Sequence, residues 1–198
     1  MWNFLLPILL PLSFHPVGIQ SEEYPPHVGE RSKVVLFVGD SLCVGMKPSF
    51  EKITRESGWR GINHCRVGTT SLQWEGWMRV EIESVNPDLV LISLGTNDGY
   101  IWERIRERGG VYGRILGTSS SRGARVVWVE PPRISPRVVR GIGWVRDSLH
   151  REVPDRFESE ECIVPPPGDG VHLTEKGYEG WMGRIWERVM STGKRENW

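Results

Sequence analysis

Short apolar runs alternate along the chain with longer segments in which apolar residues recur at helical spacing. The short runs are mostly rich in β-branched residues and bounded by glycine or proline, a pattern typical of buried strands. They lie at 33–39, 61–67, 87–95, 124–132 and 161–166. The longer segments have the spacing of amphipathic helices. They cover 41–57, 72–85, 100–120, 138–153 and 174–190, and Thr174 is a natural N-cap for the last one.

This alternation predicts an α/β fold in which a parallel sheet of about five strands is covered by helices on both faces. In such a sheet, ligands bind outside the carboxyl ends of the strands, where the following loops come together. Residues with catalytic potential are therefore most informative where they stand directly after a predicted strand.

The composition fits one globular domain and gives no sign of a charged partner. Of the 198 residues, 38% are hydrophobic, which is enough for one sizeable core. The 25 basic and 25 acidic residues cancel, so the net charge does not favour nucleic acid or an anionic membrane as a partner. The ten tryptophans would suit a carbohydrate-binding surface, but packing in the core or at a rim is the favoured role for any single one of them.

The N-terminal region differs from the rest of the chain. Residues 1–20 contain an apolar stretch, Phe4 to Phe14, which is too short to span a membrane as a helix of about 20 residues. The stretch has the length of a signal-peptide core but lacks the preceding basic residues, so 1–20 is interpreted as an export signal or a disordered leader. Residues 21–31 are expected to form a linker, 32–192 the folded domain and 193–198 a tail. An export signal would place the protein in the periplasm or outside the cell, and a leader would leave it in the cytoplasm.

The three cysteines are Cys43, Cys65 and Cys162, and they form no Cys-x-x-Cys pair, so a structural zinc site is not expected. Their odd number leaves at least one thiol unpaired within one chain. Cys43 and Cys65 are expected near the same edge of the fold, which makes a disulfide between them conceivable. Buried free thiols are the favoured interpretation.

Four short motifs carry candidate chemistry. They are Gly39 to Leu42 (GDSL), Val67 to Ser71 (VGTTS), Gly95 to Asp98 (GTND) and Asp169 to His172 (DGVH). The first three follow predicted strands and the fourth precedes the last predicted helix, so all four would converge on one edge of a parallel sheet. Together they could supply what acyl transfer requires, namely a hydroxyl, a base, a group that orients the base, and donors for an oxyanion.

Each of these parts has a candidate residue. Ser41 is the candidate nucleophile, at a strand-to-helix turn where the helix N-terminus favours developing negative charge. His172 is the candidate base, and Asp169, three residues before it, could hold the imidazole in the required tautomer. The oxyanion would be held by the backbone N–H groups of Ser41 and Gly68 and by the side-chain amide of Asn97.

With these residues the chain resembles the SGNH hydrolases, also called the GDSL esterase/lipase family, which are named for a serine, a glycine, an asparagine and a histidine in separate blocks. Ser41, Gly68, Asn97 and His172 match those four residues, and Asp169 matches the aspartate of the last block. The resemblance covers Val34 to about Met190. It implies a flavodoxin-like three-layer α/β/α sandwich, ester hydrolysis through an acyl-serine, and no metal or organic cofactor.

The resemblance leaves the substrate open. A short domain without an obvious inserted lid favours a small acyl group, such as acetyl on a carbohydrate, with a lysophospholipid or a thioester second. The expected partner is therefore a small-molecule or glycan ester, with no nucleic acid and no stable membrane span. Two other functions stay in view: an acyltransferase that uses the same residues, and a carbohydrate-binding module in which the motif residues are inert.

Taken singly, each motif also has a simpler explanation. Ser41 could only cap a helix, Asn97 could only belong to a turn, and Gly68 could only form a tight turn. The presence of all the blocks in order makes the catalytic interpretation the better one. Asp40 and Asp98 are expected to be structural, with carboxylates that bind backbone N–H groups or hold loops together.

Other aromatic and histidine residues have less definite roles. Trp74, Trp77 and Trp102 follow motif residues and could line a pocket, whereas Trp181 and Trp186 are expected in the core. His64 and His150 have no partner at a suitable spacing and are treated as lacking a role.

Overall fold

A computed structural model of the chain describes residues 31–159 and 163–193. The expected leader, nearly all of the expected linker and the residues from 194 onward lie outside this part of the chain, as does Cys162. Within the described residues, no helix is both long enough and apolar enough to cross a membrane.

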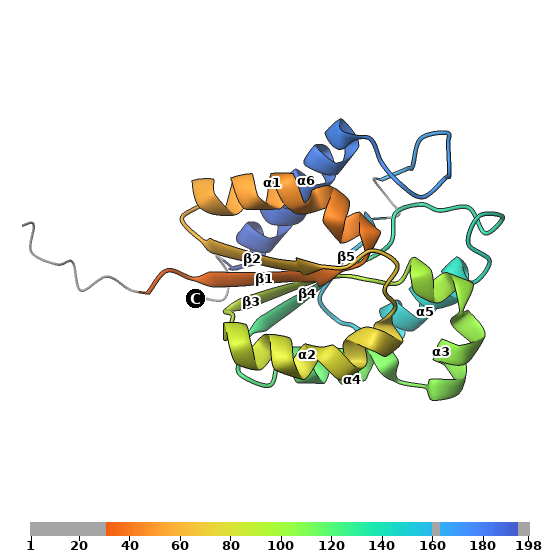
Figure 1. Cartoon of the computed structure of the whole chain (residues 1–198), viewed down its shortest axis with the longest axis horizontal. Coiled ribbons are helices and arrows are strands. Elements are labelled where there is room, and N and C mark those ends of the chain that lie inside the picture. Colours follow the sequence, from red (N-terminus) through yellow and green to blue (C-terminus); the bar gives the residue numbers. More distant parts are fainter. Residues whose placement is uncertain (1–30, 160–162, 194–198) are drawn as a thin grey trace, which may run out of the picture. The chain divides into compact units, whose positions relative to one another are not determined.

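The centre of the fold is a sheet of five parallel strands in the order β2-β1-β3-β4-β5 (Figure 1). The strands are β1 (Val34–Gly39), β2 (Arg60–Cys65), β3 (Leu89–Ser93), β4 (Arg125–Val129) and β5 (Arg156–Phe157). After β2 the chain crosses to the other side of β1 to form β3, so the strand order reverses between β1 and β3. Such a switch point opens a crevice at the carboxyl ends of the two strands.

Helices cover both faces of the sheet, which confirms the predicted three-layer α/β/α sandwich (Figure 1). One face carries α1 (Ser41–Glu56) and α6 (Glu175–Gly193). The other face carries α2 (Ser71–Val85), α4 (Val111–Ser119) and α5 (Ile142–Glu152). The short helices η1 (Asn97–Tyr100) and α3 (Trp102–Arg108) follow β3.

The core has two halves because side chains of each strand point alternately to the two faces. Val35 and Phe37 of β1 pack with α1 and α6, whereas Leu36 and Val38 pack with α2 and α4. All six residues of β1 are buried, as expected for the central strand of a parallel sheet. Thr174 caps α6 as expected, because its Oγ1 accepts a hydrogen bond from the Gly177 N–H at 3.1 Å.

The prediction of a strand at 161–166 is wrong for residues 163–166, which form no strand; 161 and 162 lie outside the described residues. The fifth strand is instead the two-residue β5, which pairs with Trp128 and Val129 of β4. The apolar character of the 161–166 segment reflects Ile163, which is buried in the core and accepts a backbone hydrogen bond from Arg133. Pro165 and Pro166 follow, and proline has no N–H to donate to a strand ladder.

Candidate active site

Ser41, His172 and Asp169 form a continuous hydrogen-bonded chain. The Oγ of Ser41 lies 2.8 Å from Nε2 of His172, and Nδ1 of the same ring lies 2.5 Å from Oδ2 of Asp169. Ser41 is the first residue of α1, directly after β1, and the other two residues stand in the loop before α6. This is the geometry of a nucleophile, a base and a group that orients the base.

The loop that carries the base is held by Asp169 itself. Its Oδ1 accepts hydrogen bonds from the backbone N–H groups of Val171 and His172, both at 2.9 Å. The hydrogen bond with the His172 side chain, together with these two backbone bonds, lowers the pKa of Asp169 well below its ordinary value. Asp169 therefore stays charged in neutral and mildly acidic solution, and the 56% exposure of its side chain also favours the charged form.

The turn that presents Ser41 depends on close backbone packing at Gly39. A Cβ added to Gly39 would lie 2.3 Å from the carbonyl oxygen of Ser93 at the end of β3. The Asp40 backbone N–H donates to that same carbonyl at 3.2 Å. The first motif thus places Ser41 next to the end of β3 because its glycine has no side chain.

Asp40 has the structural role expected for it. It is the N-cap of α1, where Oδ1 accepts a hydrogen bond from the Leu42 N–H at 2.9 Å. Its other oxygen, Oδ2, is buried and has no hydrogen-bond partner among the described residues. Burial raises the pKa of Asp40 to about 7, the Leu42 N–H opposes this shift, and the nearby Asp98 carboxylate adds to it.

Asn97 begins η1 after β3, on the other side of the switch point from the α1 helix. Its side-chain nitrogen donates to the Thr69 carbonyl at 2.9 Å, and this bond fixes the orientation of the amide. An amide NH₂ has two hydrogens, so the second remains for an oxyanion. The Thr69 bond also joins the VGTTS and GTND motifs, so the two motifs that carry the candidate oxyanion donors Gly68 and Asn97 meet directly.

Asp98 links the start of α2 to α4 through buried hydrogen bonds, as expected for a structural carboxylate. It is fully buried and accepts hydrogen bonds from the Ser71 backbone N–H at 2.8 Å, the Ser71 hydroxyl at 2.5 Å and the Tyr112 hydroxyl at 3.2 Å. Burial raises its pKa, and the hydrogen bonds from Ser71 oppose that shift. The sequence motif contained Ser71, but nothing in the sequence indicated that Tyr112 would join it.

Gly68 is the exposed tip of the turn between β2 and α2. Its φ of +75° lies in the left-handed region that favours glycine, and no described atom comes within 4 Å of a Cβ built on it. Nothing nearby in the described chain therefore blocks a substrate from reaching its N–H. The Ser41 N–H, in the first turn of α1, is one of the helix donors that have no partner within the helix.

Cys43 and Cys65 form a disulfide, with their Cα atoms 5.5 Å apart. The expectation of free buried thiols is therefore wrong for this pair, and the disulfide considered as the alternative is the correct one. Adjacent parallel strands and the helix after one of them bring the two residues together. The bridge joins the first turn of α1, two residues after Ser41, to the end of β2, three residues before Gly68.

His64 and His150 do have partners, contrary to the expectation from spacing. Nδ1 of His64 lies 2.5 Å from Oε2 of the buried Glu81, and Nε2 of His150 lies 3.0 Å from Oε1 of the buried Glu130. Each partner lies on a different element, so spacing along the chain could not reveal either pair. Both histidines contact buried carboxylates.

The tryptophans divide between the core and the surface. Trp181 and Trp186 are buried in the core as expected. Trp74 is also fully buried, so it does not line a pocket. Its indole N–H donates to the Thr69 hydroxyl at 2.9 Å and so supports the turn that contains Gly68 from the core side. Trp102 is partly exposed and lines a hollow beside α3.

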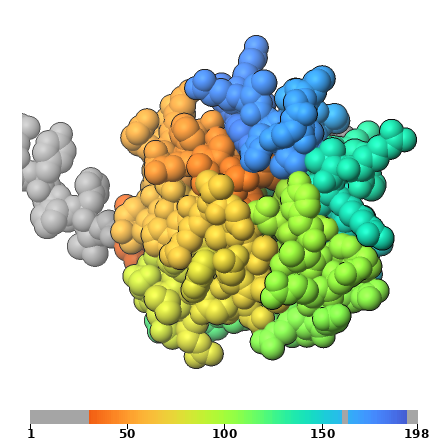
Figure 2. Space-filling model, turned by 45° about the vertical axis from the view of Figure 1, so that its right-hand side comes forward, coloured from red at the N-terminus to blue at the C-terminus, as the bar shows by residue number. Residues whose placement is uncertain are grey.

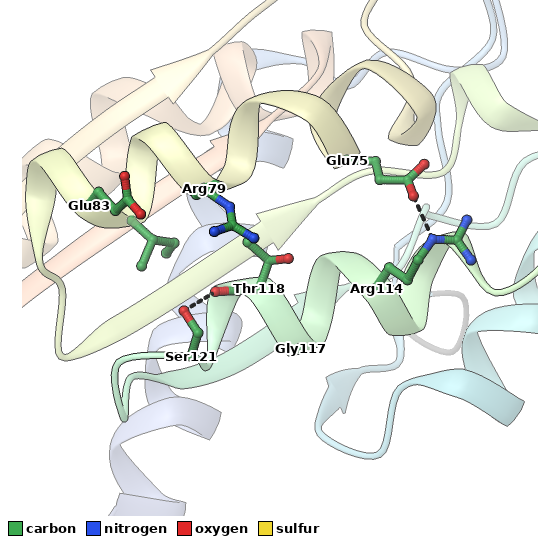
Figure 3. A pocket seen from close by; sticks show the side chains of 8 residues that line it. Glu75, Arg79, Glu83, Arg114, Gly117, Thr118 and Ser121 are labelled. Atoms are coloured by element: carbon green, nitrogen blue, oxygen red, sulfur yellow. Dashed lines mark hydrogen bonds and ion pairs between the residues drawn. The ribbon is translucent and has the colours of Figure 1, made fainter.

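A hollow of about 470 Å³ lies on the surface between α2 and α4 (Figure 3). Figure 3 shows two contacts among its lining residues: Glu75 pairs with Arg114, and Ser121 donates to the Thr118 carbonyl. None of the catalytic candidates is among the residues that line it. Its size therefore does not make it the active site.

Comparisons with solved structures identify the fold. A GDSL-like lipase from Bacteroides thetaiotaomicron matches with a TM-score of 0.59 and 18% identity over 81% of this chain and 89% of that one. The psychrotrophic esterase EstA from a Pseudoalteromonas species matches with a TM-score of 0.61 and 18% identity over 81% of this chain and 100% of that one. A serine-to-alanine variant of an acetyl esterase with acetate matches with a TM-score of 0.64 and 17% identity over 83% of this chain and 100% of that one.

The chain therefore has the three-layer fold of the GDSL, or SGNH, hydrolases, as the sequence motifs predicted. No family model matches the sequence, and no curated protein matches it. The similarity in structure extends over 81–83% of this chain in these three comparisons.

Proposed function

We propose that this protein is a serine ester hydrolase of the SGNH type. The observation that carries the proposal is the hydrogen-bonded chain from Ser41 through His172 to Asp169 at the switch point of the sheet. A helix cap needs no imidazole at its hydroxyl, and a turn aspartate needs none at its carboxylate. The fold shared with proteins described as esterases and lipases supports the same conclusion.

The proposed reaction proceeds through an acyl-serine, and the hydrogen bonds of His172 support its first step. Nε2 of His172 takes the Ser41 proton while Oγ attacks the acyl carbon, and the negative charge of Asp169 stabilises the imidazolium that forms. The carbonyl oxygen becomes an oxyanion and accepts hydrogen bonds from the N–H groups of Ser41 and Gly68 and from the Asn97 amide. The imidazolium then gives its proton to the leaving alcohol. Water repeats the sequence on the acyl-serine and releases the acid.

A small acyl group, such as acetyl on a carbohydrate, is the favoured substrate. Two proteins with the same fold are described as an acetyl esterase and an acetyl xylan esterase, which supports this preference. A lysophospholipid or a thioester is the second choice. Hydrolysis is favoured over acyl transfer to an alcohol because the triad is open to solvent: the side chains of His172 and Asp169 are 46% and 56% exposed.

The proposal is tested by comparing hydrolysis of p-nitrophenyl acetate by the wild type and by Ser41→Ala. Activity that disappears in a variant with an unchanged circular dichroism spectrum supports it. Equal rates in the two proteins, or no activity in the wild type with this ester or with acetylated xylan, would favour a binding module with inert motifs. Adding a competing alcohol such as glycerol and analysing the products separates hydrolysis from acyl transfer.

A further inference from the structure

A hollow of about 350 Å³ lies between the start of α3 and the loop that precedes α5. Figure 2 shows the two segments bordering each other on one face, α3 in green and the loop in teal. The lining includes two aromatic residues and three arginines: Tyr100, Trp102, Arg104, Arg137 and Arg140. Its size is in the range of small-molecule sites.

The charge of this hollow is strongly positive. Glu103 is its only acidic lining residue against the three arginines. All three arginines are exposed, and none of their guanidinium groups has an ion pair or hydrogen bond within residues 31–159 and 163–193. Elsewhere Arg108 and Arg114 share Glu75. Guanidinium groups bind carboxylates and phosphates with two parallel hydrogen bonds, so this lining suits an anion.

The backbone beside the hollow is held in place by contacts between the loop before α5 and the segment that contains η1 and Trp102. The Gly141 N–H donates to the Gly99 carbonyl at 3.0 Å, which ties the loop to η1. The ring of Trp102 lies so close to the Gly141 backbone that a Cβ there would be 2.4 Å from it. The Trp144 ring packs beside Trp102 with the ring centroids 6.2 Å apart. The arginines therefore extend from a backbone that is already fixed.

The hollow also adjoins the catalytic residues on two sides. Val138, which lines it, packs against Gly170, so that a Cβ on Gly170 would lie 3.0 Å from the Val138 side chain. Gly170 directly follows Asp169. On the other side, the lining residue Tyr100 is the last residue of η1, which begins with Asn97. The hollow therefore borders the loop that carries Asp169 and His172 as well as the short helix that begins with Asn97.

We infer that this arginine-lined hollow binds an anionic group of the substrate, a carboxylate or a phosphate, and so selects esters of acidic alcohols. The inference rests on the proposed ester hydrolysis. It narrows the substrate class from acetylated carbohydrates in general to those that carry an acidic group, such as a uronic acid or a sugar phosphate.

The test uses acetyl esters that differ only in charge. The wild type is assayed with an acetylated methyl glucuronoside, an acetylated methyl glucoside 6-phosphate and, as the neutral reference, an acetylated methyl glucoside. The expected result is a kcat/KM at least tenfold higher for one or both anionic esters, and a preference that weakens in 0.5 M salt because salt screens exposed charges. The double variant Arg137→Ala/Arg140→Ala should lose most of that preference.

Arg79→Ala is the matched control, because it removes an exposed arginine from the other hollow, between α2 and α4. It should keep the preference. A preference for only the carboxylate or only the phosphate supports the inference and identifies the anion. Equal rates for neutral and anionic esters, or a preference that the double variant retains, would overturn it.

A separate titration distinguishes failure of this inference from failure of the proposed function. Ser41→Ala is titrated calorimetrically with methyl glucuronoside and with methyl glucoside 6-phosphate, and the titrations are repeated after adding the two arginine substitutions. Binding that the substitutions weaken at least tenfold supports the site even if no ester is cleaved. Absence of binding, or binding that the substitutions leave unchanged, contradicts it.

Discussion

Nε2 of His172 lies 2.8 Å from Oγ of Ser41, although 131 positions separate the two residues in the sequence. One residue begins the first helix and the other precedes the last, so only the complete fold brings them together. The Asp169 carboxylate occupies the far side of the imidazole ring at 2.5 Å. In the proposed mechanism a proton moves through this arrangement from the serine to the ring and then to a leaving group.

Asn97 and Asp98 are neighbours with different roles, and paired substitutions should separate them. Asn97→Ala removes a donor for the oxyanion, so kcat should fall by about 10²–10³ while the melting temperature changes little. Asp98→Ala leaves the Ser71 and Tyr112 donors unpaired in the core, so it should lower the free energy of unfolding by about 2 kcal/mol or more. Steady-state kinetics of both variants measures kcat, and thermal and urea denaturation of both variants measure the melting temperature and the free energy of unfolding. A kcat of Asn97→Ala within threefold of the wild type would exclude Asn97 from the mechanism.

Strands β1 to β4 and the order of the motifs could be predicted from the sequence because both are local properties. The continuous apolar character of a run such as Val34–Gly39 predicts a buried strand. A serine directly after such a strand is expected at the edge of the sheet. Pairings between distant segments that no motif marks could not be predicted. The Glu81 partner of His64, the Tyr112 partner of Asp98 and the two-residue β5 all depend on contacts that form only when separate elements pack.

The glycine of the first motif should be irreplaceable for steric reasons. In Gly39→Ala the new methyl group would meet the Ser93 carbonyl, so the turn that carries Ser41 must shift, with a loss of about 1–3 kcal/mol in stability and a fall in kcat. Gly76→Ala is the matched control, because Gly76 lies in α2 with open space around its Cβ position. It should stabilise the protein by about 0.5–1 kcal/mol and leave kcat unchanged. A Gly39→Ala enzyme with wild-type kcat and stability would contradict the described packing.

The buried Asp40 should make stability depend on pH. Its pKa is near 7 in the folded protein and near its ordinary value of 3.8 in the unfolded chain. Between these values the folded state holds a proton that the unfolded state has released, so the free energy of unfolding falls as pH rises from about 4 to 7. Asp40→Asn keeps an oxygen for the Leu42 N–H and removes the charge.

Urea denaturation of the wild type and of Asp40→Asn at several pH values isolates this contribution. The stability of Asp40→Asn relative to the wild type should increase from pH 4 to pH 7, by about 1.4 kcal/mol for each unit of pKa shift. A difference that stays constant with pH would show that Asp40 titrates normally in the folded protein.

The Cys43–Cys65 disulfide should contribute to stability. The two residues are 22 positions apart, and closing a loop of that length is worth about 3 kcal/mol in the chain-entropy account. Dithiothreitol should therefore lower the urea midpoint of the wild type. It should have no further effect on Cys43→Ala/Cys65→Ala, whereas Cys162→Ala should remain sensitive to it. Insensitivity of the wild type to the reductant, with both thiols shown to be free after treatment, would contradict this contribution.

The most direct test of the central claim is to identify by peptide mass spectrometry the residue that a fluorophosphonate ester modifies. The triad predicts one adduct per chain, on Ser41, formed rapidly in the wild type and at least a hundredfold more slowly in His172→Ala, because the hydroxyl is a weak nucleophile without its base. An adduct on another residue, or labelling of Ser41 at the same rate with and without His172, would contradict the assignment of Ser41 as a nucleophile activated by His172.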